Sequence, residues 1–213
     1  MPPILYWADV SRLNTAPDLY PISEDRRAAL SALKNENVRQ QGLGAELLLI
    51  YALQQLDHTI QLPLPISRTK MGKPVLDGLN WQFSLSHSGS YAACCVYDRP
   101  LGIDIQETRH VPERFLTRFY TPDEKKTVLD SAEPDETFTR IWCRKESLLK
   151  ASGLGLSVDL KSFEVLRGEL DFQNLRYSFQ SGQTEAFHYA FCCEGRCTEP
   201  LAVQRVILPV SDR

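Results

Sequence analysis

The sequence has no apolar run of about 20 residues, no CxxC pair and no excess of basic residues. A helix that crosses a membrane needs such a run, and the opening residues MPPILYWADV lack the basic segment and apolar core of a secretion signal. The formal net charge of -3 disfavours general nucleic-acid binding, which depends on a basic surface. We therefore expect a cytoplasmic protein that binds neither membrane nor nucleic acid.

Disulfides and structural metal sites are not expected either. A chain of 213 residues buries roughly 70% of its unfolded surface, so its core needs no covalent support. The spacing of Cys193 and Cys197 would suit two metal ligands, but no second pair of suitable ligands lies nearby in the sequence. We expect free thiols at all six cysteines, which are Cys94, Cys95, Cys143, Cys192, Cys193 and Cys197.

The hydrophobic pattern predicts strands and helices in the same order twice. The first series is a strand over 4–10, helices over 23–33 (N-cap Ser23) and 38–56, and a strand, sharp turn and second strand or helix start within 83–97. The second is a strand over 101–105, helices over 112–120, 122–131 and 136–151, and a strand-rich tail over 163–210 with turns at 167–168, 181–182 and 194–195. This order predicts an α+β fold with two similar α/β halves, residues 1–101 and 102–213, related by a pseudo-twofold axis, with the active site in the cleft between them.

The segment IWCRKESLLKASGLGLS is expected on the last helix. Glu146 and Lys150 are four residues apart and therefore share a face of that helix. They form either an exposed ion pair beside a core-facing Trp142 or a pair of groups that bind a charged ligand. Taken alone, this segment favours the ion pair.

The segment GIDIQETR places an acid within a short apolar strand. Side chains alternate across a strand, so Asp104 and Gln106 point to one face and the isoleucines beside them to the other. A carboxylate in this position needs a partner, and Mg²⁺ bound by carboxylates, phosphate oxygens and water is one candidate. A turn cap or an ion pair with Arg109 is an equal alternative.

Two further segments carry groups that bind phosphate. In LSHSGS, hydroxyls flank His87 beside a glycine that permits a tight backbone, which makes Ser86 and His87 candidate phosphate contacts. Ser-His nucleophilic catalysis is disfavoured because neighbouring strand side chains diverge and no G-x-S-x-G elbow surrounds them. In KMGKP, Lys70 and Lys73 lie in a glycine turn that either binds phosphate or is simply solvated.

Taken in order, GKP, SHS, GIDI, WxxKES and a following lysine resemble the signatures of the 4'-phosphopantetheinyl transferases, specifically the two-half surfactin-synthetase-activating (Sfp) type. The resemblance covers roughly residues 71–157 and extends more loosely to RQQGLGAELLL before them. It implies a magnesium-dependent enzyme of the holo-[acyl-carrier-protein] synthase type. Coenzyme A would be its substrate.

The resemblance implies a magnesium site at Asp104 and Glu146. The family usually has a third acid two residues after the aspartate, where this sequence has Gln106, whose amide oxygen can bind the metal or orient a water. Lys150 matches a lysine near the reacting pyrophosphate, where a cation stabilises developing charge. Glu107 lies on the opposite side of the strand and is not expected to be a ligand.

The resemblance also implies contacts to coenzyme A and a base. Ser86 and His87 match phosphate contacts, with His87 on the 3'-phosphate, while Lys73 and Arg26 match basic residues that hold the nucleotide phosphates. Glu124 takes the place of an acid that helps to deprotonate the carrier serine, although a glutamate at a helix start also serves the helix dipole. The first half would then hold coenzyme A and the second half the metal and catalytic helix.

The implied reaction transfers 4'-phosphopantetheine from coenzyme A to a serine of an apo acyl or peptidyl carrier protein and releases 3',5'-ADP, with Glu146 or Glu124 as base. The two-half length implies a monomer, and fatty-acid, polyketide and nonribosomal-peptide carriers are all possible partners. Apolar residues of ERFLTRFY would recognise the carrier or pack on the core. The alternatives are a non-catalytic coenzyme A or carrier-protein binding module, which only Gln106 supports, and a hydrolase that uses Ser86 or a free cysteine.

Overall fold

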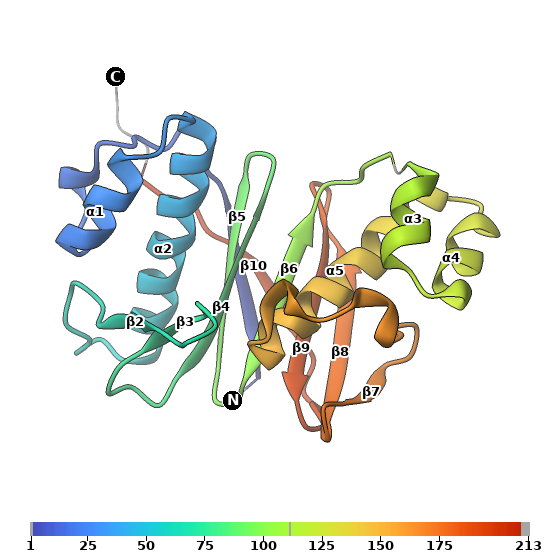
Figure 1. Cartoon of the computed structure of the whole chain (residues 1–213). Coiled ribbons are helices and arrows are strands. Elements are labelled where there is room, and N and C mark those ends of the chain that lie inside the picture. The colour runs from blue at the N-terminus through green and yellow to red at the C-terminus, as the bar shows by residue number, and fades with distance from the viewer. Residues whose placement is uncertain (1, 111, 210–213) are drawn as a thin grey trace. The chain divides into compact units, whose positions relative to one another are not determined.

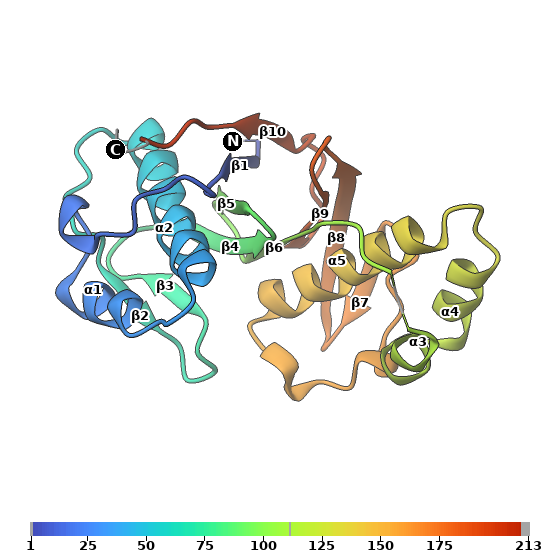
Figure 2. The same ribbon diagram turned by 90° about the horizontal axis from the view of Figure 1, so that it is seen from above.

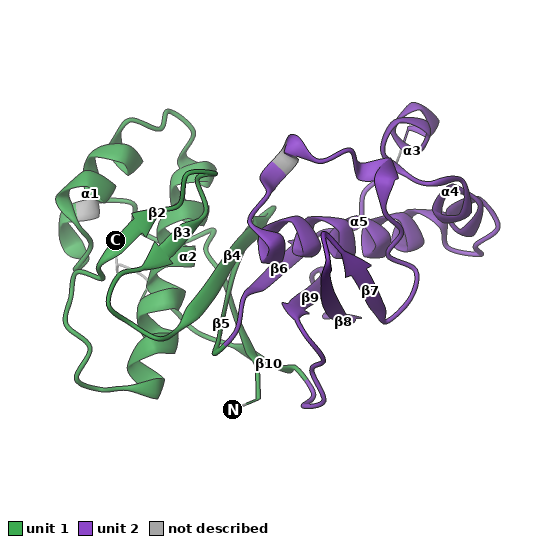
Figure 3. Cartoon of the chain, turned by 60° about the horizontal axis from the view of Figure 1, so that its bottom comes forward, with its two compact units in different colours: residues 1–98, 201–213 green, residues 99–200 purple. Residues whose placement is uncertain are grey.

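The computed structural model describes residues 2–110 and 112–209, which form two compact units. The first unit is 1–98 with 201–213 and the second is 99–200 (Figure 3). Each has a four-stranded sheet and one long helix, so the predicted α+β class with two α/β halves is confirmed. The chain returns to the first unit after Pro200, whereas the sequence analysis assigned the whole of 102–213 to the second half.

In the first unit, the sheet has the order β10-β1-β5-β4. Its strands are β1 (Ile4–Asp9), β4 (Gln82–Ser88), β5 (Tyr91–Tyr97) and β10 (Ala202–Arg205). Helix α2 (Glu36–Leu56) lies along one face of this sheet (Figure 2). Alternate residues of β1 and β5 pack with the leucines of α2 in one hydrophobic core.

Smaller elements complete the first unit: η1 (Pro17–Leu19), α1 (Glu24–Ser31), β2 (Ile66–Arg68) and β3 (Pro74–Leu76). Ser23 caps α1 as predicted, because its hydroxyl accepts from the Arg26 amide. Helix α2 begins earlier than predicted, since the Asn35 side chain caps it. The hairpin of β2 and β3 was not predicted, and the KMGKP turn joins its strands with Gly72 at a φ of 86°.

In the second unit, the antiparallel sheet has the order β6-β9-β8-β7. Its strands are β6 (Leu101–Gln106), β7 (Glu169–Phe172), β8 (Leu175–Gln183) and β9 (His188–Glu194). Helix α5 (Pro134–Ser152) packs across β6 and β9 (Figure 1) and ends at Gly153, whose φ is 69°. The remaining helices are α3 (Glu113–Phe119), α4 (Pro122–Leu129), η2 (Gly155–Ser157) and η3 (Leu160–Ser162). No helix in the described part of the chain is long and apolar enough to cross a membrane.

The turns of the tail differ in part from the prediction. The prediction of a turn at 181–182 is wrong, because both residues lie inside β8. The ring of Tyr189 occupies the space that a side chain at position 182 would need, so a glycine stands there. The β7-β8 turn falls instead at Gln173 and Asn174, with φ of 51° and 64°. The turn at 194–195 is confirmed, with Gly195 at a φ of 76°.

Candidate functional site

The site of the second unit depends on a close approach between β6 and α5. A Cβ atom at Gly102 would overlap the backbone oxygen of Ser147, so only glycine fits where the helix crosses the strand. Because side chains alternate along a strand, Asp104 and Gln106 share the face of Gly102 and point toward α5. The tight crossing therefore brings the predicted acidic position against the predicted catalytic helix.

Asp104 forms an ion pair with Lys150 on this face. The distance from Lys150 Nζ to Asp104 Oδ1 is 2.8 Å, and the aspartate side chain is 9% exposed against 30% for the lysine. A partner for the buried carboxylate was expected, and Lys150 supplies it in the structure. The Lys150 side chain is partly exposed, so an anionic ligand can reach it.

Glu146 lies one helical turn before Lys150 and is half-buried. Burial raises the pKa of Glu146 above its ordinary value of 4.5, and the nearby charge of Asp104 raises it further, while Lys150 lowers it. Two carboxylates thus lie within electrostatic reach of each other, with one ammonium to balance them. Such a cluster favours the binding of a cation.

The donors at this position suit a hard metal ion. Within residues 2–110 and 112–209, no group of three or more His, Cys, Asp or Glu side chains is arranged to hold a metal. Asp104 and Glu146 contribute two carboxylates, and half-buried Gln106, on the strand face of Asp104, contributes an amide oxygen. These oxygen ligands fit Mg²⁺, which usually takes one or two carboxylates and fills its other positions with water and phosphate.

A cavity of about 250 Å³ borders this cluster in the second unit. Gln106 lines it from β6, and the aromatic rings of Phe138 and Trp142 line it from the first half of α5. Phe115 of α3 packs against Trp142, with ring centroids 5.1 Å apart. The full lining is Gln106, Arg109, His110, Pro112, Phe115, Phe138 and Trp142.

Cys143 is a supporting residue that the sequence reasoning missed. Its buried thiol donates to the backbone oxygen of His188 on β9 at 3.6 Å and lies near Asp104, whose charge raises the pKa of the thiol. Burial is the main cause that raises the pKa of this thiol well above its ordinary value, so it stays protonated as a donor. Its helical spacing from Glu146 and Lys150, three and seven residues, was the available signal.

The structure does not support Glu124 as a base. Its side chain is fully buried, and Oε2 pairs with Lys145 Nζ at 2.8 Å while accepting from the Thr121 amide at 2.9 Å. Its Oε1 accepts from the Val165 amide at 3.0 Å. Both oxygens are therefore engaged in a helix cap and an internal ion pair, and no carboxylate surface is open to a carrier serine.

The predicted phosphate contacts of the first unit lie on two faces of β4. Ser86 is buried, with 4% exposure, whereas His87 is exposed, and neighbouring strand residues point to opposite sides. His87 shares its face with Phe83 and Leu85, which line a cavity of about 360 Å³. One phosphate group on either face therefore cannot contact both Ser86 and His87 side chains.

Arg26 lines the same cavity from α1, and Pro74, which follows Lys73, lines it from β3. Part of the Arg26 guanidinium is engaged, since Nε pairs with Glu46 at 2.6 Å and Nη2 donates to the Gly42 oxygen at 2.9 Å. The structure thus places Arg26 in this cavity with chain neighbours of Lys73 and His87, whereas Lys73 and His87 themselves do not line it. The full lining is Ser23, Asp25, Arg26, Ala29, Glu46, Leu64, Ile66, Arg68, Pro74, Phe83 and Leu85.

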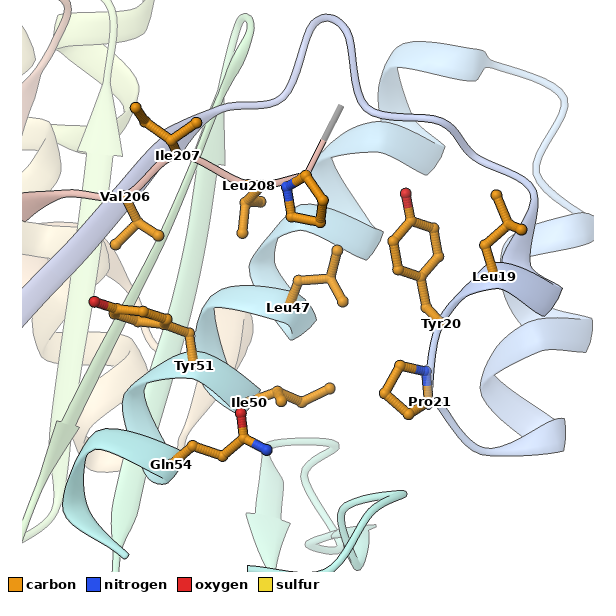
Figure 4. A pocket seen from close by; sticks show the side chains of 11 residues that line it. Leu19, Tyr20, Pro21, Leu47, Ile50, Tyr51, Gln54, Val206, Ile207 and Leu208 are labelled. Carbon is orange, nitrogen blue, oxygen red and sulfur yellow. The ribbon is translucent and has the colours of Figure 1, made fainter. Parts of the chain in front are cut away.

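Another hollow of the first unit is apolar and has a volume of about 530 Å³ (Figure 4). None of the predicted site residues is part of its lining, so it is separate from the candidate site. Its lining is Leu19, Tyr20, Pro21, Leu47, Ile50, Tyr51, Gln54, Val206, Ile207, Leu208 and Pro209.

Comparison with known proteins identifies the class. Residues 100–204 match the family model of the 4'-phosphopantetheinyl transferase superfamily, and this stretch contains the whole Asp104, Glu146 and Lys150 cluster. The predicted family is confirmed, and residues 100–204 are a region of that superfamily.

Three individual relatives are phosphopantetheinyl transferases. The chain is 32% identical over 152 residues to 4'-phosphopantetheinyl transferase psf-1 of Bacillus pumilus (70% of this chain, 65% of the relative). It is 36% identical over 102 residues to 4'-phosphopantetheinyl transferase Sfp of Bacillus subtilis (46% of each chain). It is 35% identical over 116 residues to L-aminoadipate-semialdehyde dehydrogenase-phosphopantetheinyl transferase of Mus musculus (46% of this chain, 38% of the relative). The matched parts span 65% of the length of psf-1, 46% of the length of Sfp and 38% of the length of the Mus musculus relative.

Proposed function

We propose that this chain transfers 4'-phosphopantetheine from coenzyme A to a serine of an apo acyl or peptidyl carrier protein, with release of 3',5'-ADP. The observation that carries the proposal is the cluster of Asp104, Glu146 and Lys150, which two elements bring together inside the region that matches the superfamily. The chemistry of the cluster, two acids beside an accessible ammonium, suits binding of a pyrophosphate with its cation.

Asp104, Glu146 and Gln106 would hold Mg²⁺, which when bound neutralises charge on the pyrophosphate oxygens. Lys150 stabilises the negative charge that develops on the leaving 3',5'-ADP, because Asp104 holds its ammonium in place and its side chain is partly exposed. Glu146 accepts the proton of the attacking serine hydroxyl, directly or through a water.

In the first unit, His87, Lys73 and Arg26 are the proposed contacts to the coenzyme A phosphates. The support is that Arg26 lines a cavity together with Pro74, the chain neighbour of Lys73, and with Phe83 and Leu85 on the strand of His87. Ser86 would contact phosphate only from the other face of β4. The family resemblance supports three finer points: dependence on magnesium, a cytoplasmic location and a monomeric state. The proposed partners are fatty-acid, polyketide and nonribosomal-peptide carriers.

The test is the mass of an apo carrier protein after incubation with the purified chain, coenzyme A and Mg²⁺. We expect a gain equal to the mass of coenzyme A minus 3',5'-ADP, and loss of that gain when Mg²⁺ is chelated. Asp104→Asn should reduce the rate at least 100-fold, because one preorganised charge at a reacting centre contributes about 10²–10³ in rate.

The matched control is Asp130→Asn, which removes an exposed carboxylate that pairs with Lys126 on α4. It should leave the rate unchanged. If apo carriers of all three pathway classes gain no mass while coenzyme A binds measurably, the chain is a binding module and the proposal fails.

A further inference from the structure

A pair of cysteines outside the candidate site meets at the end of β9. Cys193 lies opposite Ser178 of β8, and its sulfur is 3.5 Å from the Ser178 hydroxyl. The chain then reverses at Gly195, and the amide of Cys197 donates to the same hydroxyl at 3.1 Å. One serine side chain therefore holds both cysteines at the two ends of a five-residue turn.

The two thiols lie near each other and differ in accessibility. Cys197 is close enough to raise the pKa of Cys193, and Gln180 Nε2 lies 3.4 Å from the Cys197 sulfur. Cys193 is fully buried, and burial raises its pKa to about 11, although the nearby guanidinium of Arg99 lowers it in part. Cys197 is half-exposed and can meet a small molecule in solution.

We propose that Cys193 and Cys197 are a modification site, a dithiol that a small-molecule disulfide such as oxidised glutathione converts into an intramolecular disulfide. The Cys197 thiolate attacks the reagent, forms a mixed disulfide and releases one glutathione thiolate. Cys193 then attacks the Cys197 sulfur, gives its proton to the second departing glutathione, and closes the Cys193–Cys197 bond. Two protein thiols are oxidised and one reagent disulfide is reduced to two thiols.

The neighbouring cysteine shows why the pairing is specific. Cys192 points to the other face of β9 and packs within the hydrophobic core of the second unit. Only Cys193 of this adjacent pair faces Ser178 and the turn. The inference is independent of the proposed transferase activity, because none of these groups belongs to the Asp104 cluster.

The cleavage pattern of trypsin gives a direct readout. Cleavage after Arg176, Arg196 and Arg205 separates the peptides 177–196 and 197–205. We would incubate the folded full chain in buffers of rising oxidised-to-reduced glutathione ratio, alkylate the remaining thiols under denaturing conditions, digest and record peptide masses. A Cys193–Cys197 bond joins these two peptides and disappears on reduction.

We expect the joined peptide in the unmodified chain and in Cys192→Ser, which keeps both partners. Cys193→Ser should lose it and instead carry glutathione on Cys197, and Cys197→Ser, a change at a half-exposed position, should lose it without accumulating that adduct. The proposal is overturned if the joined peptide persists in Cys193→Ser. It is also overturned if Cys197 in the unmodified chain accumulates only the glutathione adduct.

Discussion

Two lysine–carboxylate pairs on α5 show how one interaction serves two purposes. Lys145 pairs with Glu124, and Lys150, five residues later, pairs with Asp104, each with N···O of 2.8 Å. The first pair has no exposed surface, and Lys145 also donates to the backbone oxygens of Leu160 and Phe163. The second pair is partly open to solvent on its lysine side.

The difference lies in what else each charge can contact. Every oxygen of Glu124 already has a donor, so this pair fixes α4, α5 and the segment before β7 to one another. Beside the Lys150 pair lies Glu146, a carboxylate whose pKa is raised by burial and by the charge of Asp104, and lowered in part by Lys150. We call the buried Lys145–Glu124 pair the inner pair and the partly exposed Lys150–Asp104 pair the outer pair. We infer that the inner pair determines the position of α5 and that the outer pair exchanges partners with ligand.

The largest expected effect on stability is that of Glu124→Gln in the inner pair. The change leaves the ammonium of Lys145 buried without a counter-charge, which costs about 3–5 kcal/mol of unfolding free energy. The free energy is measured by urea unfolding. Lys145→Met combined with Glu124→Gln should recover part of the loss, because no buried charge then remains.

Asp130→Asn is the control, since its pair with Lys126 is exposed and should leave the unfolding midpoint unchanged. Equal stability of Glu124→Gln and the unmodified chain would show that the inner pair is not structural. The base role predicted for Glu124 from sequence would then need to be considered again.

The outer pair is tested by Lys150→Met. Loss of the ammonium should lower kcat for carrier modification by about 10²–10³, because charge on the leaving group is no longer stabilised. The stability loss should be smaller than for Glu124→Gln, since Lys150 is 30% exposed. Steady-state kinetics with an apo carrier and urea unfolding give the two values. Lys126→Met, a change at an exposed lysine of α4, should alter neither, and a drop in stability without a drop in kcat in Lys150→Met would reverse the roles of the two pairs.

The sequence was enough to predict the outer pair in part, and the reason is that its geometry is local. Helical spacing placed Glu146 and Lys150 on one face of the predicted helix, and strand alternation placed Asp104 and Gln106 on one face of the predicted strand. The pairing of Lys150 with Asp104 was not predicted. It depends on the crossing of β6 and α5, which Gly102 permits.

The inner pair was not predictable in the same way. The sequence shows a capping box from Thr121 to Glu124, but the burial of Glu124 depends on Val165 and Lys145, which lie 41 and 21 residues away along the chain. The local pattern at the start of α4 therefore does not show that Glu124 is buried. Gly182 was misjudged for a similar reason, because the ring of Tyr189 opposite it in β9 is invisible to local turn rules.

The smallest expected effect is that of Glu146→Gln at different pH values. It tests how far the charges of the outer cluster, which is Glu146 with the outer pair, are compensated within the protein. The pKa of Glu146 is raised in the folded state above 4.5, so its contribution to stability is fully present below that pH and is lost as the pH rises through the folded pKa. The glutamine variant lacks this loss. In buffer with a chelator it should unfold at a slightly higher temperature than the unmodified chain at pH 7, and at the same temperature below pH ~4.5.

Excess Mg²⁺ should then stabilise the unmodified chain more than the Glu146→Gln variant, since a ligand of the folded state raises its stability by mass action. Glu133→Gln, at an exposed position that begins the same helix, should behave as the unmodified chain throughout. If Glu146→Gln is less stable at pH 7 without Mg²⁺, the charge of Glu146 is already compensated within the protein, and the outer cluster is a second structural pair.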